Sequence, residues 1–273
     1  MMGMYALFVL ASFYVANALN VSNMTYSEFK ELQKTRVSPP TKPYTSSPNK
    51  TNSPPVVDWR YIMTPIKDQA QCGSCYAESS VATYEAMWTI HTGRKHNFSV
   101  QQAMDCSTTQ GNEGCNGGWM HSVYDWIITN EGIELNSEDP YVAITANCTP
   151  SLNKTQIAFL DNWVYVKPTQ KDIISWLPLQ PVTVAVAADG CWQEYTSGIV
   201  TGKKCPSSLD PPELDHGVVV VGYDLTHKIP HFTVRNSWGT GWGEDGYIRI
   251  AINFTHDKGL FGIASQPTAP LIQ

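Results

Sequence analysis

The spacing of apolar residues divides the chain into a first half with helical patterns and a second half with strand patterns. From Cys75 to His91, apolar side chains recur every three or four residues until Thr92-Gly93 ends the run, which predicts an amphipathic helix. The other helices are predicted at Val100–Cys106 and Trp119–Asn130. Strands are predicted at Val182–Ala187, Val218–Tyr223, Phe232–Asn236 and Tyr247–Ile252. The expected fold class is α+β, with a helical domain facing an antiparallel, barrel-like β domain.

The segment up to residue 52 has the features of an export signal followed by a linker. An apolar run from Met4 to Leu19 is too short to span a bilayer reliably, and Ala16-Asn17-Ala18 forms an A-x-A cleavage site. We therefore expect a signal peptide at 1–18, a short prosegment or linker at 19–52 and the mature domain at 53–273. A buried N-terminal helix is the alternative. Because the linker is rich in Ser, Thr and Pro, it is predicted not to pack.

Asn-x-Ser/Thr sequons agree with a secretory route, which leads outside the cell or to a lysosome or other acidic vesicle. They begin at Asn20, Asn23, Asn49, Asn97, Asn147, Asn153 and Asn253. No stretch after the N-terminal run is long and apolar enough to be expected as a stable membrane anchor.

Composition narrows the class of partner. A net charge of −6 and a pI of about 5.6 argue against nucleic acid as a partner, because nucleic acid selects basic surfaces. A hydrophobic content of 42% is enough for a substantial core, so the chain is expected to fold as a globular protein.

Cys75 stands in a sequence context that suits a nucleophile. Ser74 is a good N-cap residue, so Cys75 is expected in the first turn of the predicted helix. There the unpaired N–H groups and the positive end of the helix dipole stabilise a thiolate, which is the reactive form of cysteine. The alternative is that Cys75 is half of a disulfide, as most cysteines of secreted proteins are. Seven cysteines leave one over, however.

Two residues far along the chain suit a proton-transfer pair. His216 directly precedes the predicted buried strand that starts at Val218, and a strand end is a rigid mount for catalysis. Asn236 ends another predicted strand, and alone it would be an ordinary turn residue. Taken together, Cys75, His216 and Asn236 favour nucleophilic catalysis.

These segments resemble the papain and cathepsin family of cysteine peptidases. Cys72-Gly73-Ser74-Cys75-Tyr76 matches the family motif C-G-[SA]-C-[WY], and the likeness extends from Val57 to about Pro267. The resemblance implies a two-domain fold with Cys75 and His216 on opposite walls of a cleft. It implies no cofactor and no metal, a monomer, polypeptide substrates, and inhibition by the chain's own prosegment and by cystatin-like proteins.

The resemblance also implies a role for each matching residue. Cys75 would be the nucleophile, and His216 would be the general base and then the general acid. Asn236 would orient the imidazole, Gln69 would donate a side-chain N–H to the oxyanion, and Trp238 would shield the pair from water.

The disulfides implied by the resemblance are Cys72–Cys115 and Cys106–Cys148. The third departs from the family, because Phe261 occupies the position of the usual partner of Cys205. We expect Cys205 to pair with Cys191 instead; the alternative is two thiols.

By the same resemblance, an extended substrate would bond to a glycine segment beside an apolar pocket for the residue before the cleaved one. The matching residues are Gly117, Gly118, Trp119, Met120, Ala185, Leu214 and Gln266. The lining favours Leu, Val or Phe over Arg. Because no His pair lies between Cys106 and Cys115, endopeptidase action is expected rather than exopeptidase action.

Glu78 is the main departure near the site, since the family usually has an apolar aromatic residue there. The simplest interpretation is a carboxylate that benefits from the helix N-terminus; a carboxylate facing Cys75 would raise the pKa of the thiol. Glu78 therefore leaves open an impaired homologue that acts as a secreted binding protein. A second alternative is a disulfide-rich structural glycoprotein.

Cys72 and Cys75 form a C-x-x-C pair, but no second pair follows at zinc spacing, so a zinc site is not expected.

Overall fold

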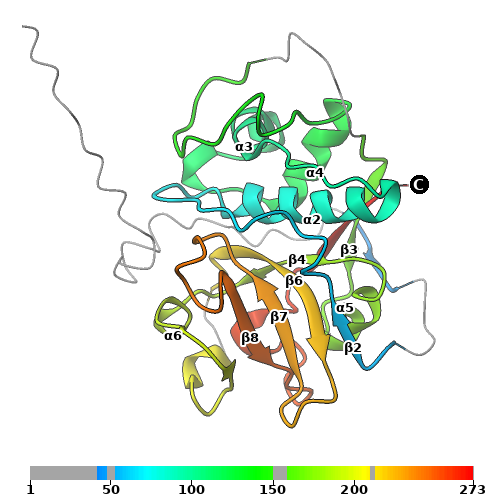
Figure 1. Cartoon of the computed structure of the whole chain (residues 1–273), viewed down its shortest axis with the longest axis vertical. Helices are drawn as coiled ribbons and strands as arrows, with labels where there is room; N and C mark the ends of the chain where they lie inside the picture. The colour runs from blue at the N-terminus through cyan, green and yellow to red at the C-terminus, as the bar shows by residue number, and fades with distance from the viewer. Residues whose placement is uncertain (1–41, 48–52, 150–158, 210–212, 273) are drawn as a thin grey trace, which may run out of the picture.

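The computed structural model describes residues 42–47, 53–149, 159–209 and 213–272, and the signal peptide expected at 1–18 lies outside them. In Figure 1 the helices α2, α3 and α4 form one layer above a sheet, and α2 runs along the boundary between the two. The α-helices are α2 (Cys75–Thr92), α3 (Val100–Cys106), α4 (Met120–Thr129), α5 (Gln170–Trp176) and α6 (Gly190–Gln193). None of the described helices is long and apolar enough to cross a membrane.

The strands form one sheet with the order β1-β3-β9-β4-β6-β7-β8-β5, and β2 adds to β6. Most neighbours are antiparallel, whereas β1–β3 and β5–β8 are parallel. Within the described residues the sheet stays open, so the expected barrel-like domain is a curved sheet rather than a closed barrel. The strands are β1 (Tyr44–Thr45), β2 (Val56–Asp58), β3 (Asn162–Val166), β4 (Val182–Val186), β5 (Ile199–Val200), β6 (His216–Asp224), β7 (His231–Arg235), β8 (Tyr247–Ala251) and β9 (Thr268–Leu271).

The sequence pattern located the long elements and missed the short ones. The α+β fold class is confirmed, and each predicted helix and strand is present with ends shifted by at most two residues. The elements that the pattern did not predict include α5, α6 and the strands β1, β2, β3, β5 and β9. The strands β1, β2, β5 and β9 and the helix α6 have two to four residues, too few for a hydrophobic period to stand out, whereas β3 and α5 are as long as the predicted β4 and α3.

The amphipathic character predicted for α2 is wrong. Its residues from Cys75 to Ala86 are all buried, because the helix lies between two layers. Ser80 donates a hydrogen bond to the carbonyl oxygen of Met120 in α4, while Thr83 accepts one from Thr183 in β4. A helix covered on both faces has no polar stripe, so its small hydroxyl side chains face neighbouring elements instead of water.

Part of the linker that was expected not to pack adds a strand to the sheet. Tyr44 and Thr45 form β1 and pair with Tyr165 and Val166 of β3. Ser47 is buried, and its hydroxyl donates to the carbonyl oxygen of Ser175. A two-residue strand has too few positions to show alternation, which is why the Pro-rich composition concealed it.

Candidate active site

Cys75 is the first residue of α2 and is fully buried. It is the one cysteine of the chain that forms no disulfide. The residue before it is the N-cap, but the Ser74 side chain does not cap the helix as expected: its hydroxyl is hydrogen-bonded to that of Tyr141 at 2.6 Å. The Ser74 side chain therefore accepts no hydrogen bond from the first N–H groups of the helix. These N–H groups favour an anion at Cys75.

The start of β6 packs directly against the first turn of α2. A Cβ atom added to Gly217 would lie 3.0 Å from the carbonyl oxygen of Cys75 and 2.9 Å from Oγ of Ser79. Glycine is therefore required here for a close approach of two backbones. Because His216 directly precedes Gly217, this approach brings the backbone at His216 next to that of Cys75, although the two residues are 141 positions apart in sequence.

Asn236 fixes the orientation of the His216 ring. Nε2 of His216 lies 2.7 Å from Oδ1 of Asn236, and the backbone N–H of Ser237 donates to the same oxygen. Since a carbonyl oxygen only accepts, Nε2 carries the proton of this bond and Nδ1 is the nitrogen left for the sulfur. The Trp238 ring lies over the imidazole, with ring centroids 5.0 Å apart.

Burial makes the imidazolium form of His216 costly. The residue is fully buried, which lowers the pKa of His216 to about 4, although the hydrogen bond with Asn236 raises it. A charged ring in this position needs a counter-charge, and a thiolate at Cys75 is the group placed to supply it.

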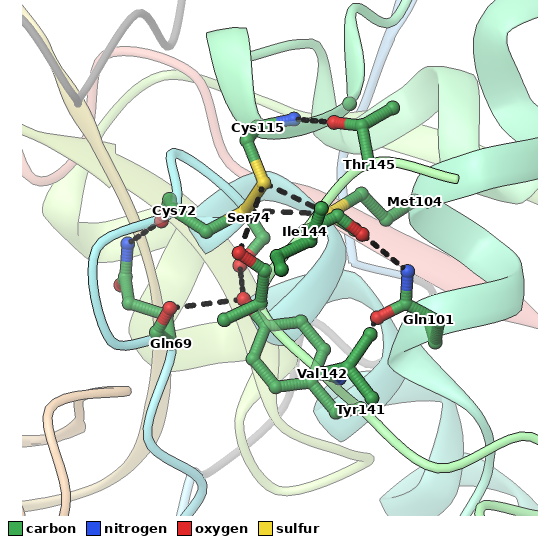
Figure 2. The surroundings of a disulfide bond; sticks show 12 residues. Gln69, Cys72, Ser74, Gln101, Met104, Cys115, Tyr141, Val142, Ile144 and Thr145 are labelled. Carbon is green, nitrogen blue, oxygen red and sulfur yellow. Dashed lines mark hydrogen bonds between the residues drawn. A yellow bond between two sulfur atoms is a disulfide. The ribbon is translucent and has the colours of Figure 1, made fainter. Parts of the chain in front are cut away.

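Gln69 is held on both sides of its amide. Its Nε2 donates to the carbonyl oxygen of Cys72 at 2.9 Å, and its Oε1 accepts from the hydroxyl of Ser237 at 2.6 Å. Figure 2 shows the hydroxyl of Tyr141 donating to the carbonyl oxygen of Gln69. No sequence motif pointed to a role for Tyr141, whereas Ser237 could have been found from its position directly after Asn236.

The structure forms the three disulfides that were expected: Cys72–Cys115, Cys106–Cys148 and Cys191–Cys205. The first ties the loop before α2 to the glycine segment, and Figure 2 shows Met104 beside it, with Sδ 3.4 Å from Sγ of Cys72. Because Phe261 occupies the position of the usual partner of Cys205, the third disulfide forms instead with Cys191, only 14 residues away in sequence.

The residues expected to bind substrate lie in three places: an apolar cluster, the region close to β9, and the glycine segment before α4. Met120, Ala185 and Leu214 belong to one buried apolar cluster of the helical layer, whereas Gln266 is buried close to β9. Gly117 has a positive φ of 96°, Gly118 is confined by the Asn112 side chain, and Trp119 is half-buried at the N-cap of α4. Their roles toward a substrate remain predictions.

The simplest interpretation of Glu78, a carboxylate that benefits from the helix N-terminus, does not account for its surroundings. Its side chain is only 2% exposed, and burial raises the pKa of Glu78 to about 7. The hydrophobic pattern could not reveal this, because it treats a glutamate in a helix as solvent-facing. The signal that could have identified it is the run of small and apolar residues on all sides of α2.

Comparison with known proteins agrees with this geometry. The sequence model described as "Papain family cysteine protease" matches residues 53–271. The oryzain beta chain of Oryza sativa subsp. japonica is 39% identical over 221 residues, which is 80% of this chain and 46% of that protein. The chain thus spans about half the length of this relative.

Two solved structures resemble the fold. Bromelain from Ananas comosus in complex with the E64 inhibitor is 32% identical with a TM-score of 0.73, covering 81% of this chain and all of that one. Digestive procathepsin L 3 from the larval midgut of Tenebrio molitor is 31% identical with a TM-score of 0.80, covering 92% of this chain and 80% of that one.

Proposed function

The chain belongs to the papain family of cysteine proteases, and on this premise we propose that it is a thiol-dependent endopeptidase. The observation that carries the proposal is the arrangement around His216. Its ring is held by Asn236 at 2.7 Å, and its neighbour Gly217 touches the backbone of Cys75. A nucleophile, a base and an orienting amide are thereby assembled from three separate segments.

The proposed reaction has two stages, acylation of Cys75 and hydrolysis of the acyl-enzyme, and the same residues act in both. The Cys75 thiolate attacks the carbonyl carbon of the substrate, and the oxyanion accepts hydrogen bonds from the Cys75 backbone N–H and the second N–H of Gln69. The His216 imidazolium protonates the leaving amine, and an acyl-enzyme remains. His216 then takes a proton from water, which attacks the thioester and releases the acid and the thiolate.

Hydrolysis of a fluorogenic Phe-Arg peptide across pH 4–8 tests the proposal. We expect activity that disappears in proportion to the labelling of Cys75 by an epoxide thiol trap, with one label bound per molecule. The bromelain structure is in complex with the E64 inhibitor, so E64 is tested beside this reagent. Hydrolysis that survives complete labelling of Cys75 would place the activity in another group.

The apolar cluster predicts the preference at the residue before the cleaved one. Because Met120, Ala185 and Leu214 are apolar and buried, a substrate with Leu in this position should be hydrolysed about tenfold or more faster than one with Arg, whose charge would lose its water shell. Paired peptides that differ only at this residue provide the measurement. Equal kcat/KM values for the two peptides would show that these residues do not line the pocket.

Gln69→Ala tests the oxyanion role. Loss of one donor should lower kcat about 100-fold and leave KM nearly unchanged, because the donor acts on charge that develops only in the transition state. Steady-state kinetics measure both constants. Ser237→Ala is the matched control: it frees the amide of Gln69 but keeps the donor, so its loss should be smaller. An equal loss of kcat in both variants would contradict a direct role for Gln69.

We also propose export of the protein, processing of the prosegment and inhibition by cystatin-like proteins. The Tenebrio relative is a digestive proform from the midgut, which supports a prosegment and a digestive or vesicular setting. The packing of β1 against β3 indicates that part of the segment at 19–52 is anchored to the sheet rather than lying free.

A further inference from the structure

Glu78 lies one helical turn after Cys75 and is isolated inside the protein. Neither of its carboxylate oxygens has a hydrogen-bond partner among the residues that the structure describes. An ionisable side chain left in this way is costly, since a buried polar group without a partner loses its hydration without compensation. A buried and unpartnered carboxyl group beside a catalytic pair therefore requires an explanation.

The side chain of Glu78 borders a small cavity of about 10 Å³. This is close to the smallest space that holds one water molecule. The wall is made by α2, by the start of β6, by the segment that follows β7 and by one lysine of the loop before α2. The lining residues are Lys67, Glu78, Ser79, Ala82, Gly217, Val218, Val219, Arg235, Asn236 and Ser237.

Asn236 reaches the same cavity with a donor. Its Oδ1 accepts from His216 and from the backbone of Ser237, but its Nδ2 has no hydrogen-bond partner among the described residues. Glu78 and Asn236 thus line one space of the size of a water molecule, and the side-chain atoms that they leave without a partner are two acceptor oxygens and an amide donor. Their chemistry is complementary, because a water molecule can accept from the amide and donate to the carboxylate.

We propose that a water molecule bound in this cavity links the carboxyl group of Glu78 to Nδ2 of Asn236, which makes Glu78 a positioning residue for His216. The inference rests on the proposed function, because it concerns the same catalytic pair. Glu78 acts through the amide: by holding Nδ2 it keeps Oδ1 directed at Nε2 of His216. A metal cation is disfavoured in this cavity because Lys67 and Arg235 already border it.

The charged groups around Glu78 come from each element packed against it. Lys67 and Arg235 lower the pKa of Glu78, whereas Glu85 and Asp68 raise it. Glu78 in turn raises the pKa of Tyr141, and His216 lies at the start of β6, which borders the same cavity. Lys67 is paired with Glu85, and Arg235 donates to the carbonyl oxygens of Thr64 and Pro65. An ionised Glu78 would therefore add a negative charge that stabilises the imidazolium of His216.

Alkylation of Cys75 by iodoacetamide between pH 4 and 10, measured beside kcat and KM, tests the inference. Glu78→Gln keeps an acceptor oxygen but loses the charge, so we expect kcat within about threefold of wild type. The Cys75–His216 pair loses its protons in two steps, and the second step is the deprotonation of the imidazolium. Without the negative charge of Glu78, the pKa of this second step should fall by at least about 0.5 unit. Glu78→Leu also removes the acceptor, so kcat should fall about tenfold at unchanged KM.

Asp257→Asn removes the same charge from an exposed position and is the matched control. Alkylation profiles that coincide for wild type, Glu78→Gln and Glu78→Leu would overturn the inference, as would an equal shift in Asp257→Asn. The readout separates the two proposals: a wild-type protein that alkylates with an ion-pair profile but cleaves no peptide contradicts the proposed function alone. In that case the alkylation profiles still decide the role of Glu78.

Discussion

Cys75→Ala is expected to lower kcat/KM for peptide hydrolysis by a factor on the order of 10⁴ or more. In the proposed mechanism the sulfur of Cys75 forms the acyl-enzyme, whereas the other groups bind the substrate, polarise its carbonyl group and transfer protons. The thiol lies at the N-terminus of α2 beside the strand that carries His216. Full progress curves with a Phe-Arg peptide at pH 6 provide the measurement.

The control for this variant is its fold. Replacing a buried thiol by a methyl group leaves the three disulfides in place, so the thermal unfolding midpoint should stay within about 5 °C of that of the alkylated wild type. Hydrolysis by Cys75→Ala within tenfold of the wild-type rate would show that a different residue is the nucleophile.

Glu78→Gln is expected to stabilise the protein by roughly 3 kcal/mol at pH 8 and hardly at all at pH 4. Burial raises the pKa of Glu78 from 4.5 to about 7, and each unit is worth about 1.4 kcal/mol. The sign follows from the proton count. Between pH 4.5 and about 7 the folded state keeps a proton that the unfolded state has lost, so stability falls as the pH rises through this window. Because glutamine does not titrate, the stability of the variant lacks this pH dependence.

Thermal unfolding at pH 4 and pH 8 measures this effect. In the Cys75→Ala background, which prevents self-digestion, the Glu78→Gln variant should unfold about 6–12 °C higher than its parent at pH 8. Asp257→Asn serves again as the control and should follow its parent at both pH values. Parallel pH curves for the Glu78→Gln variant and its parent would show that the carboxyl group does not titrate in this window.

The two effects of Glu78 act in opposite directions on the protein. Ionisation lowers the stability of the fold near neutral pH, yet the same charge supports the imidazolium of His216. At the pH of an acidic vesicle Glu78 would be mostly protonated, which removes the cost of burying its charge.

Local patterns accounted for the long elements because each is fixed by its own residues. The run from Cys75 to Thr92 contains enough turns for a period to be visible, and Gly93 ends it in a left-handed conformation. The strands β4, β6 and β8 each contain two or more valine or isoleucine residues, and β7 contains Phe232 and Val234, so their burial follows from composition. By contrast, β1 and β5 exist only because a neighbouring strand edge accepts them.

The candidate catalytic residues could be proposed from the sequence because each lies in a motif of the family. The Cys72–Tyr76 motif and the segments around His216 and Asn236 mark the thiol, the base and the amide. Their mutual geometry is a different matter. The hydrogen bond between His216 and Asn236 depends on the adjacent ends of β6 and β7, and no local pattern encodes which strand ends meet.

The sequence by itself located the long helices and strands and named the candidates for the chemistry. The family resemblance implied two of the three disulfides, and the departure at Phe261 suggested the third. Only the tertiary structure decided that α2 is buried on both faces, that Tyr44 and Thr45 join the sheet, and that Glu78 shares a cavity with Asn236. The reason is physical. Motifs and periodicities depend on neighbours along the chain, whereas burial and the loss of hydration depend on neighbours in space.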